Sequence, residues 1–90
     1  MGDNKVIDVL KSLADPTRLA IVRSLATCES GQKSCSDISA KIKLSQPAMS
    51  HHFGKLVDSG VVIEAKDGTK KIYRLNTALL ATVGINAAKL

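Results

Sequence analysis

One stretch constrains the fold of this chain more than any other: residues 44–58, which read LSQPAMSHHFGKLVD. Ser45 has the features of a helix N-cap, because a serine hydroxyl accepts a hydrogen bond from a free amide in the first turn. Pro47 would lie in that first turn, where a missing N–H costs nothing. At about 100° per residue, one face of the helix is apolar and the other is polar. The apolar face holds Met49, Phe53, Leu56 and Val57, and the polar face holds Pro47, Ser50, His51, Gly54, Lys55 and Asp58.

The polar face of this helix suits contact with a nucleic-acid groove. Its N-terminal part carries short hydrogen-bonding side chains, and it contains no large apolar residue. Gln46 and Ser50 can bond base edges, and His51 can donate to a base or a phosphate. We therefore predict that this helix enters the major groove of DNA. His52 lies on the flank between the two faces, where packing or a phosphate contact is more plausible than base readout.

Apolar spacing predicts three helices before this one. The first covers about residues 5–13, and the second runs from Pro16, capped by Asp15, to about Ala26. A polar, glycine-containing loop is predicted over residues 28–34. Ser36 would cap a short third helix whose inward residues are Ile38, Ile42 and Leu44. Only the turn 43–45 separates it from the helix after Ser45, which predicts a helix-turn-helix.

The pattern changes after Gly60, a predicted C-terminal stop. Residues 61–66 and 70–75 are β-prone and flank Asp67-Gly68-Thr69, which indicates a hairpin. A last helix is predicted from Thr77, with Leu79, Leu80 and Val83 as apolar positions that could extend to Ile85, and with Gly84 and Asn86 weakening its end. The whole order predicts one domain over residues 1–90. It is mainly α with a β-hairpin, a winged helix-turn-helix of order α-α-α-α-β-β-α.

The charge balance favours a polyanionic partner. Lys and Arg total 13 against 8 Asp and Glu, which gives a net charge of +5. No run approaches the roughly 18 apolar residues that span a bilayer, and the N-terminus has no signal-peptide core, so we expect a cytoplasmic protein without membrane contact. The sequence does not group a nucleophile with a general base, and it has no glycine-rich phosphate-binding loop, so we expect that the protein is not an enzyme.

The residues predicted to contact phosphates flank the helix-turn-helix and lie in the hairpin: Lys43, Lys55, Lys70, Lys71 and Arg74, with Lys41 and Lys66 nearby.

Three segments in the right order resemble the ArsR/SmtB family of bacterial winged-helix repressors: LADPTRLAIV over 13–22, LSQPAMSHHF over 44–53, and SGVV with KIYRL over 59–62 and 71–75. The resemblance covers about residues 5–76. It implies a homodimer built from residues of about 5–13 and 77–90, bound to a pseudo-palindromic operator until an inducer binds. It also implies that Gln46, Ser50 and His51 face bases or nearby phosphates, in a bacterial cytoplasm and at the nucleoid when bound.

The sequence departs from that family in ways that bear on regulation. Gly54 stands where relatives carry a larger polar or basic residue. Serines replace both cysteines of the family's metal motif in Ser34-Cys35-Ser36, and residues 77–90 contain no metal-ligating side chain, so we expect no metal or other cofactor. Two alternatives stay open. Cys28 and Cys35 could form a redox switch, with a lowered pKa for Cys35 near a helix N-terminus. Otherwise the fold could be a protein-interaction module that no longer binds DNA.

Overall fold

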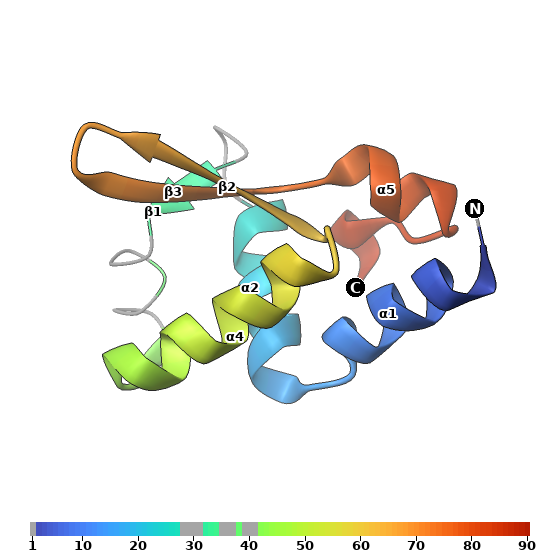
Figure 1. Cartoon of the computed structure of the whole chain (residues 1–90), viewed down its shortest axis with the longest axis horizontal. Helices are drawn as coiled ribbons and strands as arrows, with labels where there is room; N and C mark the ends of the chain where they lie inside the picture. The colour runs from blue at the N-terminus through green and yellow to red at the C-terminus, as the bar shows by residue number, and fades with distance from the viewer. Residues whose placement is uncertain (1, 28–31, 35–37, 39–41) are drawn as a thin grey trace.

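The computed structural model describes residues 2–27, 32–34, 38 and 42–90 of the chain. Cys28, Cys35 and Lys41 lie outside the described residues, and so does the predicted third helix apart from Ile38 and Ile42. The described elements follow one another as shown in Figure 1. They are α1 (Asp3–Leu13), α2 (Pro16–Ala26), β1 (Gln32–Ser34), α4 (Gln46–Asp58), β2 (Val62–Asp67), β3 (Lys70–Leu75), α5 (Thr77–Thr82) and the 3-10 turn η1 (Ala87–Lys89).

The predicted hairpin is present, and it belongs to a three-stranded antiparallel sheet. β2 and β3 pair from Val62 opposite Leu75 to Asp67 opposite Lys70. Gly68 has a φ of 65° in the two-residue turn, which confirms the need for a residue that accepts positive φ there. The prediction of a loop over 28–34 was wrong for its last part. Gln32–Ser34 form β1, which pairs with β3 to give the order β1-β3-β2.

The core lies between α2, α4 and the sheet and is almost entirely aliphatic. Val9, on α1, is fully buried, so α1 also contributes to it. Phe53 and Tyr73 are its two aromatic members, and their rings stack with centroids 4.1 Å apart and planes 17° from parallel. Fully buried side chains come from α2, α4, the third-helix region, the start of the hairpin and α5: Ile21, Val22, Ile38, Met49, Leu56, Val61 and Leu80.

Gly60 makes the corner between α4 and the hairpin. Its φ is +84°, and a Cβ there would lie 3.1 Å from Leu79 and 3.2 Å from the Nζ of Lys5. The same Nζ donates a 2.7 Å hydrogen bond to the carbonyl oxygen of Ser59. The Asn76 side chain donates to the carbonyl oxygen of Gly60 at 3.0 Å. The predicted stop at Gly60 is confirmed, and α1 is tied to the corner that ends α4.

The last helix is shorter than predicted. α5 ends at Thr82, because the chain turns at Gly84, whose φ is +84°. The amide of Ile85 then donates to the carbonyl oxygen of Leu80 at 2.8 Å, and Ile85 packs against the core instead of extending the helix. α1 also begins at Asp3, two residues before the predicted boundary.

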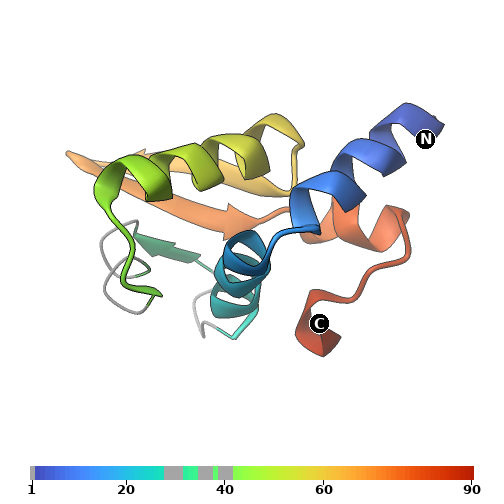
Figure 2. The same cartoon turned by 90° about the horizontal axis from the view of Figure 1, so that it is seen from below.

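The elements divide the molecule into two ends. The hairpin tip and the N-terminal end of α4 lie at one end, and α1 and α5 lie at the other (Figure 1). Figure 2, seen from below, shows α4 alongside the hairpin while α1 and η1 lie away from the hairpin tip. The arrangement is a winged helix-turn-helix, as predicted. No helix in the described part of the chain is long and apolar enough to span a bilayer.

Candidate nucleic-acid interface

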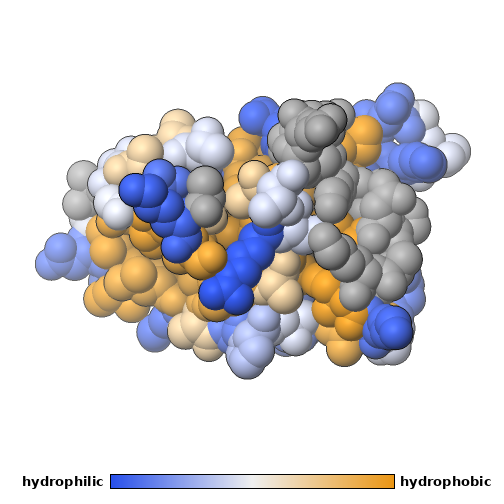
Figure 3. Space-filling view, turned by 180° about the vertical axis from the view of Figure 1, so that it is seen from behind, coloured by the Kyte–Doolittle hydropathy of each residue, from blue (hydrophilic) through white to orange (hydrophobic). Residues whose placement is uncertain are grey.

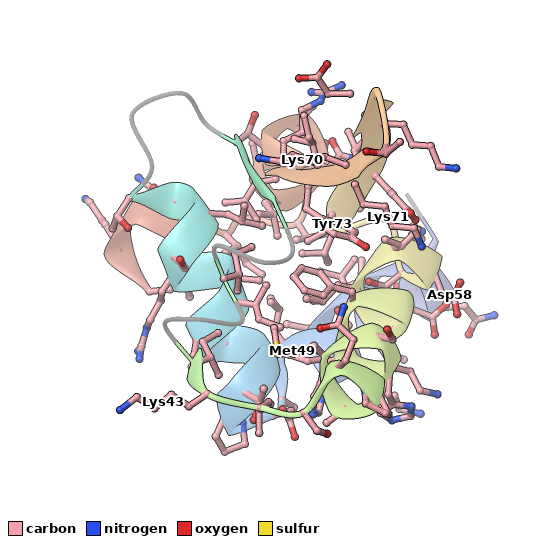
Figure 4. The ribbon with its side chains drawn as sticks, turned by 90° about the vertical axis from the view of Figure 1, so that its left-hand side faces the viewer. Lys43, Met49, Asp58, Lys70, Lys71 and Tyr73 are labelled. Atoms are coloured by element: carbon pink, nitrogen blue, oxygen red, sulfur yellow. The ribbon has the colours of Figure 1, made fainter. Side chains whose placement is uncertain are left out.

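α4 is held with one face in the core. It begins as predicted, with the Ser45 hydroxyl accepting a 3.3 Å hydrogen bond from the amide of Ala48 and Pro47 in the first turn. Met49, Phe53 and Leu56 are buried, and Val57 is half-buried. In Figure 4, Met49 and Tyr73 lie in the interior, between the helices and the hairpin. Three buried anchors fix the roll of the helix, so its opposite face is presented to solvent.

That opposite face carries the residues predicted to contact DNA. Gln46, Ser50, His51 and Lys55 are all exposed. Gly54 is exposed among them, and no large apolar side chain interrupts the surface. The structure therefore leaves four of the predicted contact residues exposed on α4. Gln46 lies in its first turn, at the end of the molecule that carries the hairpin tip, whereas Lys55 lies in its last turn and lines a hollow with Asp8 and Lys11 of α1.

The predicted phosphate-contacting residues lie on both sides of α4. Lys43 is exposed in the turn before α4, with a φ of 60°, an uncommon conformation for a non-glycine residue. Lys70, Lys71 and Arg74 are exposed on β3. Figure 4, which looks onto this end of the molecule, shows Lys43 and Lys70 far apart at opposite edges. A polyanion lying across α4 would meet a cation on each side.

A small hollow of about 230 Å³ lies between α4 and the hairpin, beside the stacked rings of Phe53 and Tyr73. Ser50 and Gly54 line it from α4, and Tyr73 lines it from β3. It also has two carboxylates, Asp58 and Glu64, that sequence reasoning did not assign to the site. The Glu64 carboxylate lies 3.5 Å from the Nζ of Lys71. Since both side chains of this pair are partly exposed, it stabilises the fold little, and Lys71 can exchange Glu64 for a phosphate.

Gly54 is not required by packing within the chain. A Cβ built on it would meet no atom within 4 Å. It lies in the interior of α4, where glycine has a lower helix propensity than any residue except proline. The glycine therefore costs stability without serving an internal contact.

Replacing Gly54 by alanine should raise the free energy of unfolding by about 0.8–1.0 kcal/mol, the difference in helix propensity between the two residues. Urea denaturation of the two proteins measures this difference. Gly60→Ala is the matched control and should destabilise, because its backbone has positive φ and its Cβ would press on Leu79. If the Gly54→Ala protein is less stable than the wild type, the space around Gly54 in solution does not admit a Cβ, which contradicts the structure.

A polar cluster behind α4 was not foreseen from the sequence. Asp15 caps α2, and its Oδ2 accepts a 2.9 Å hydrogen bond from the amide of Arg18. The same Oδ2 lies 3.7 Å from Nδ1 of His52 on α4. The hydrogen bond from the Arg18 amide, followed by the charge of the Arg18 guanidinium, lowers the pKa of Asp15 below its usual value. The helix cap at Asp15, followed by Pro16, was visible in the sequence. The contact of Asp15 with His52, 37 positions later, was not.

The lowered pKa of Asp15 gives the fold a dependence on acid. A carboxyl whose pKa is lower in the folded chain stabilises it fully above its unfolded pKa, and that contribution is lost as the pH falls through the folded value. Asp15→Asn keeps a good cap but removes the charge. The stability difference between wild type and Asp15→Asn should therefore shrink as the pH falls below about 4. Urea midpoints measured from pH 6 to pH 2.5 test this, and parallel curves would contradict it.

The described residues contain no candidate site for a metal ion, and they do not include either cysteine. Among the residues that the structure describes, no three His, Cys, Asp or Glu side chains are grouped closely enough to hold a metal ion. His51 and His52 have ring centroids 5.5 Å apart in an edge-on arrangement. The redox prediction for Cys28 and Cys35 falls outside the described residues.

Comparison with known proteins gives consistent matches. The family model described as bacterial regulatory protein, arsR family, matches residues 15–64. The arsenical resistance operon repressor of Staphylococcus xylosus is 36% identical over 86 residues, covering 96% of this chain and 80% of the relative. HlyU from Vibrio cholerae matches in structure with a TM-score of 0.77 and 30% identity, over 92% of this chain and 90% of that one. The transcriptional repressor BigR from Xylella fastidiosa gives 0.72 and 31%, over 89% and 80%.

Proposed function

This chain belongs to the ArsR family of bacterial regulatory proteins, and from that premise we propose that it is a homodimeric repressor that binds a pseudo-palindromic operator in double-stranded DNA. Its family and relatives are DNA-binding transcription regulators, which confirms the prediction that it is not an enzyme. One observation carries the proposal furthest. The recognition helix, α4, is locked into the core by its apolar face and exposes Gln46, Ser50 and His51 beside a basic hairpin.

The exposed groups divide into two kinds by their chemistry. Gln46, Ser50 and His51 offer hydrogen bonds of the kind that read base edges in the major groove. The lysines and the arginine offer charge, which fixes the position on the duplex without reading its sequence. The phosphate-contacting set in this proposal is Lys43, Lys55, Lys70, Lys71 and Arg74.

The end of the molecule opposite the hairpin tip supports the dimer in this proposal. On α1, Ile7 and Leu10 are 46% and 51% exposed, unusual values for large apolar residues. A hollow of about 490 Å³ near the C-terminus is lined mainly by apolar residues, among them Leu75, Leu80 and Ile85. Figure 3 shows apolar surface gathered toward this end. Two copies joined there would present two recognition helices to one duplex, as a two-fold operator requires.

The proposal places the protein in the cytoplasm, at its operator, and includes no metal cofactor. It also sets aside the interaction-module alternative. A module that had lost DNA binding would expose an apolar or acidic face on α4. The exposed face of α4 is instead polar and flanked by lysines.

Selection from a random duplex library, followed by affinity measurements at several salt concentrations, tests the proposal. The expected result is enrichment of one inverted-repeat sequence, bound by two protein chains. If six phosphates are neutralised, the log–log slope of affinity against salt should be about −5. Sedimentation of the free protein at micromolar concentration should give the dimer mass. Failure to enrich any sequence, with a folded protein, would contradict the proposed function.

A further inference from the structure

Arg18 contacts three elements of the fold at once. Its Nε donates a 2.6 Å hydrogen bond to the carbonyl oxygen of Ser12, and Nη2 lies 3.5 Å from the carbonyl oxygen of Lys11, both in the last turns of α1. Its backbone amide donates to the capping carboxylate of Asp15 at the start of α2. Its Nη1 lies 3.4 Å from Nδ1 of His52, on the recognition helix. One side chain therefore connects the α1–α2 corner to α4.

The chemistry of the contact assigns the role of each partner. A guanidinium can only donate, so Nδ1 of His52 accepts in this contact and its ring proton lies on Nε2. Asp15 stands beside the same nitrogen and balances the charge of Arg18. The His52 side chain is only 17% exposed, so it is held behind α4, away from the groove-facing surface. Its neighbour His51 is exposed on that surface.

Building on the proposed repressor function, we propose that Arg18 is a positioning residue for operator recognition, acting on the recognition helix through His52. The core fixes the depth and roll of α4 through Met49, Phe53 and Leu56. The Arg18–His52 contact adds a polar link at the middle of the helix, one residue from His51. It fixes the angle of α4 relative to α1, the helix that joins the two copies in the proposed dimer. The spacing of two recognition helices on one operator depends on that angle.

The test separates positioning from direct DNA contact by comparing two affinities. His52→Leu removes the acceptor, whereas His52→Asn keeps an amide oxygen where Nδ1 stands. Arg18→Met removes the donor, and Arg23→Met is its matched control, since Arg23 is exposed in the last turn of the same helix. Each variant is titrated with the selected operator and with an unrelated duplex at several salt concentrations.

The expected result is a loss of discrimination at constant non-specific binding. His52→Leu and Arg18→Met should each lower the ratio of operator to unrelated affinity by about tenfold, the effect of one hydrogen bond to a charged group. His52→Asn should keep the ratio within about threefold of wild type. The Arg18→Met/His52→Leu double variant should lose no more than Arg18→Met alone, because Arg18→Met already removes the link to His52. Arg23→Met should leave the ratio unchanged.

Three results would overturn the proposal. A direct phosphate contact would weaken both duplexes alike and reduce the salt slope. An unchanged ratio in His52→Leu would show that the link does not govern recognition. Additive losses in the double variant would show that the two residues act separately. If the wild-type protein itself fails to prefer any operator, the proposed function fails instead, and the two failures are thereby distinguished. Retained binding of the unrelated duplex shows that each variant is folded.

Discussion

Replacing Phe53 by alanine should lower the free energy of unfolding by about 3–5 kcal/mol, the range for removing a buried phenylalanine. Phe53 is 2% exposed, and its ring stacks on Tyr73 at a centroid distance of 4.1 Å. Through this stacking it joins the recognition helix to the hairpin. Since small domains are stable by only about 5–15 kcal/mol, this one change should unfold a large fraction of the chain under mild denaturant.

Urea denaturation followed by circular dichroism measures this loss. Phe53→Leu is the matched control, because leucine refills part of the volume and leaves a smaller cavity, so its loss should be clearly smaller. The exposed Lys55→Ala change on the same helix should shift stability by no more than about 0.5 kcal/mol. A loss below about 1 kcal/mol for Phe53→Ala would show that α4 and the hairpin do not share one core in solution.

The recognition helix could be predicted because its determinants are local. A serine cap, a proline in the first turn and an apolar repeat all lie within 14 residues, and the glycine that ends it follows directly. The hairpin was predictable for the same reason, since Asp67-Gly68 is a turn signal between two β-prone runs. The structure confirms the cap at Ser45, the stop at Gly60 and the positive φ of Gly68.

The elements that sequence reasoning missed depend on contacts between distant residues. β1 has three residues and no apolar alternation, and it exists through hydrogen bonds to β3, with Lys33 opposite Tyr73. The end of α5 had a local signal in Gly84, whose φ is positive, but the packing of Ile85 against the core was not visible in the sequence. The pairing of β1 and the packing of Ile85 are not encoded in a local pattern, so a window along the sequence cannot find them.

In the candidate site too, features with local determinants were predictable, and contacts between distant residues were not. Exposure of Ser50 and His51 followed from helical periodicity alone. The contact of His52 with Arg18 joins residues 34 positions apart and required the fold to bring α2 behind α4. The sequence placed His52 between the two faces of the helix. That position favoured packing or a phosphate contact over base readout, and it gave no sign of the contact with Arg18.

The largest expected effect on function is that of Ser50→Ala/His51→Ala. Each side chain should contribute about 1–3 kcal/mol to operator recognition, or about 5- to 150-fold in affinity, if both bond base edges. Alanine favours helix, and neither side chain is buried, so the double variant should keep the fold. Its operator affinity should fall toward that for unrelated DNA, while its affinity for unrelated DNA stays close to wild type.

Lys70→Gln/Lys71→Gln is the matched control for this loss, because it removes charge from the hairpin without touching the recognition helix. It should weaken the operator and unrelated duplexes alike, and the salt slope should become shallower by about 0.9 for each phosphate contact removed. Fluorescence anisotropy with both duplexes at several salt concentrations measures all of these quantities. The two double variants should thus differ in what they lose. Ser50→Ala/His51→Ala loses discrimination and keeps its salt dependence, whereas Lys70→Gln/Lys71→Gln has a shallower salt dependence and keeps its discrimination. Wild-type operator preference in Ser50→Ala/His51→Ala would mean that the exposed face of α4 does not read the sequence.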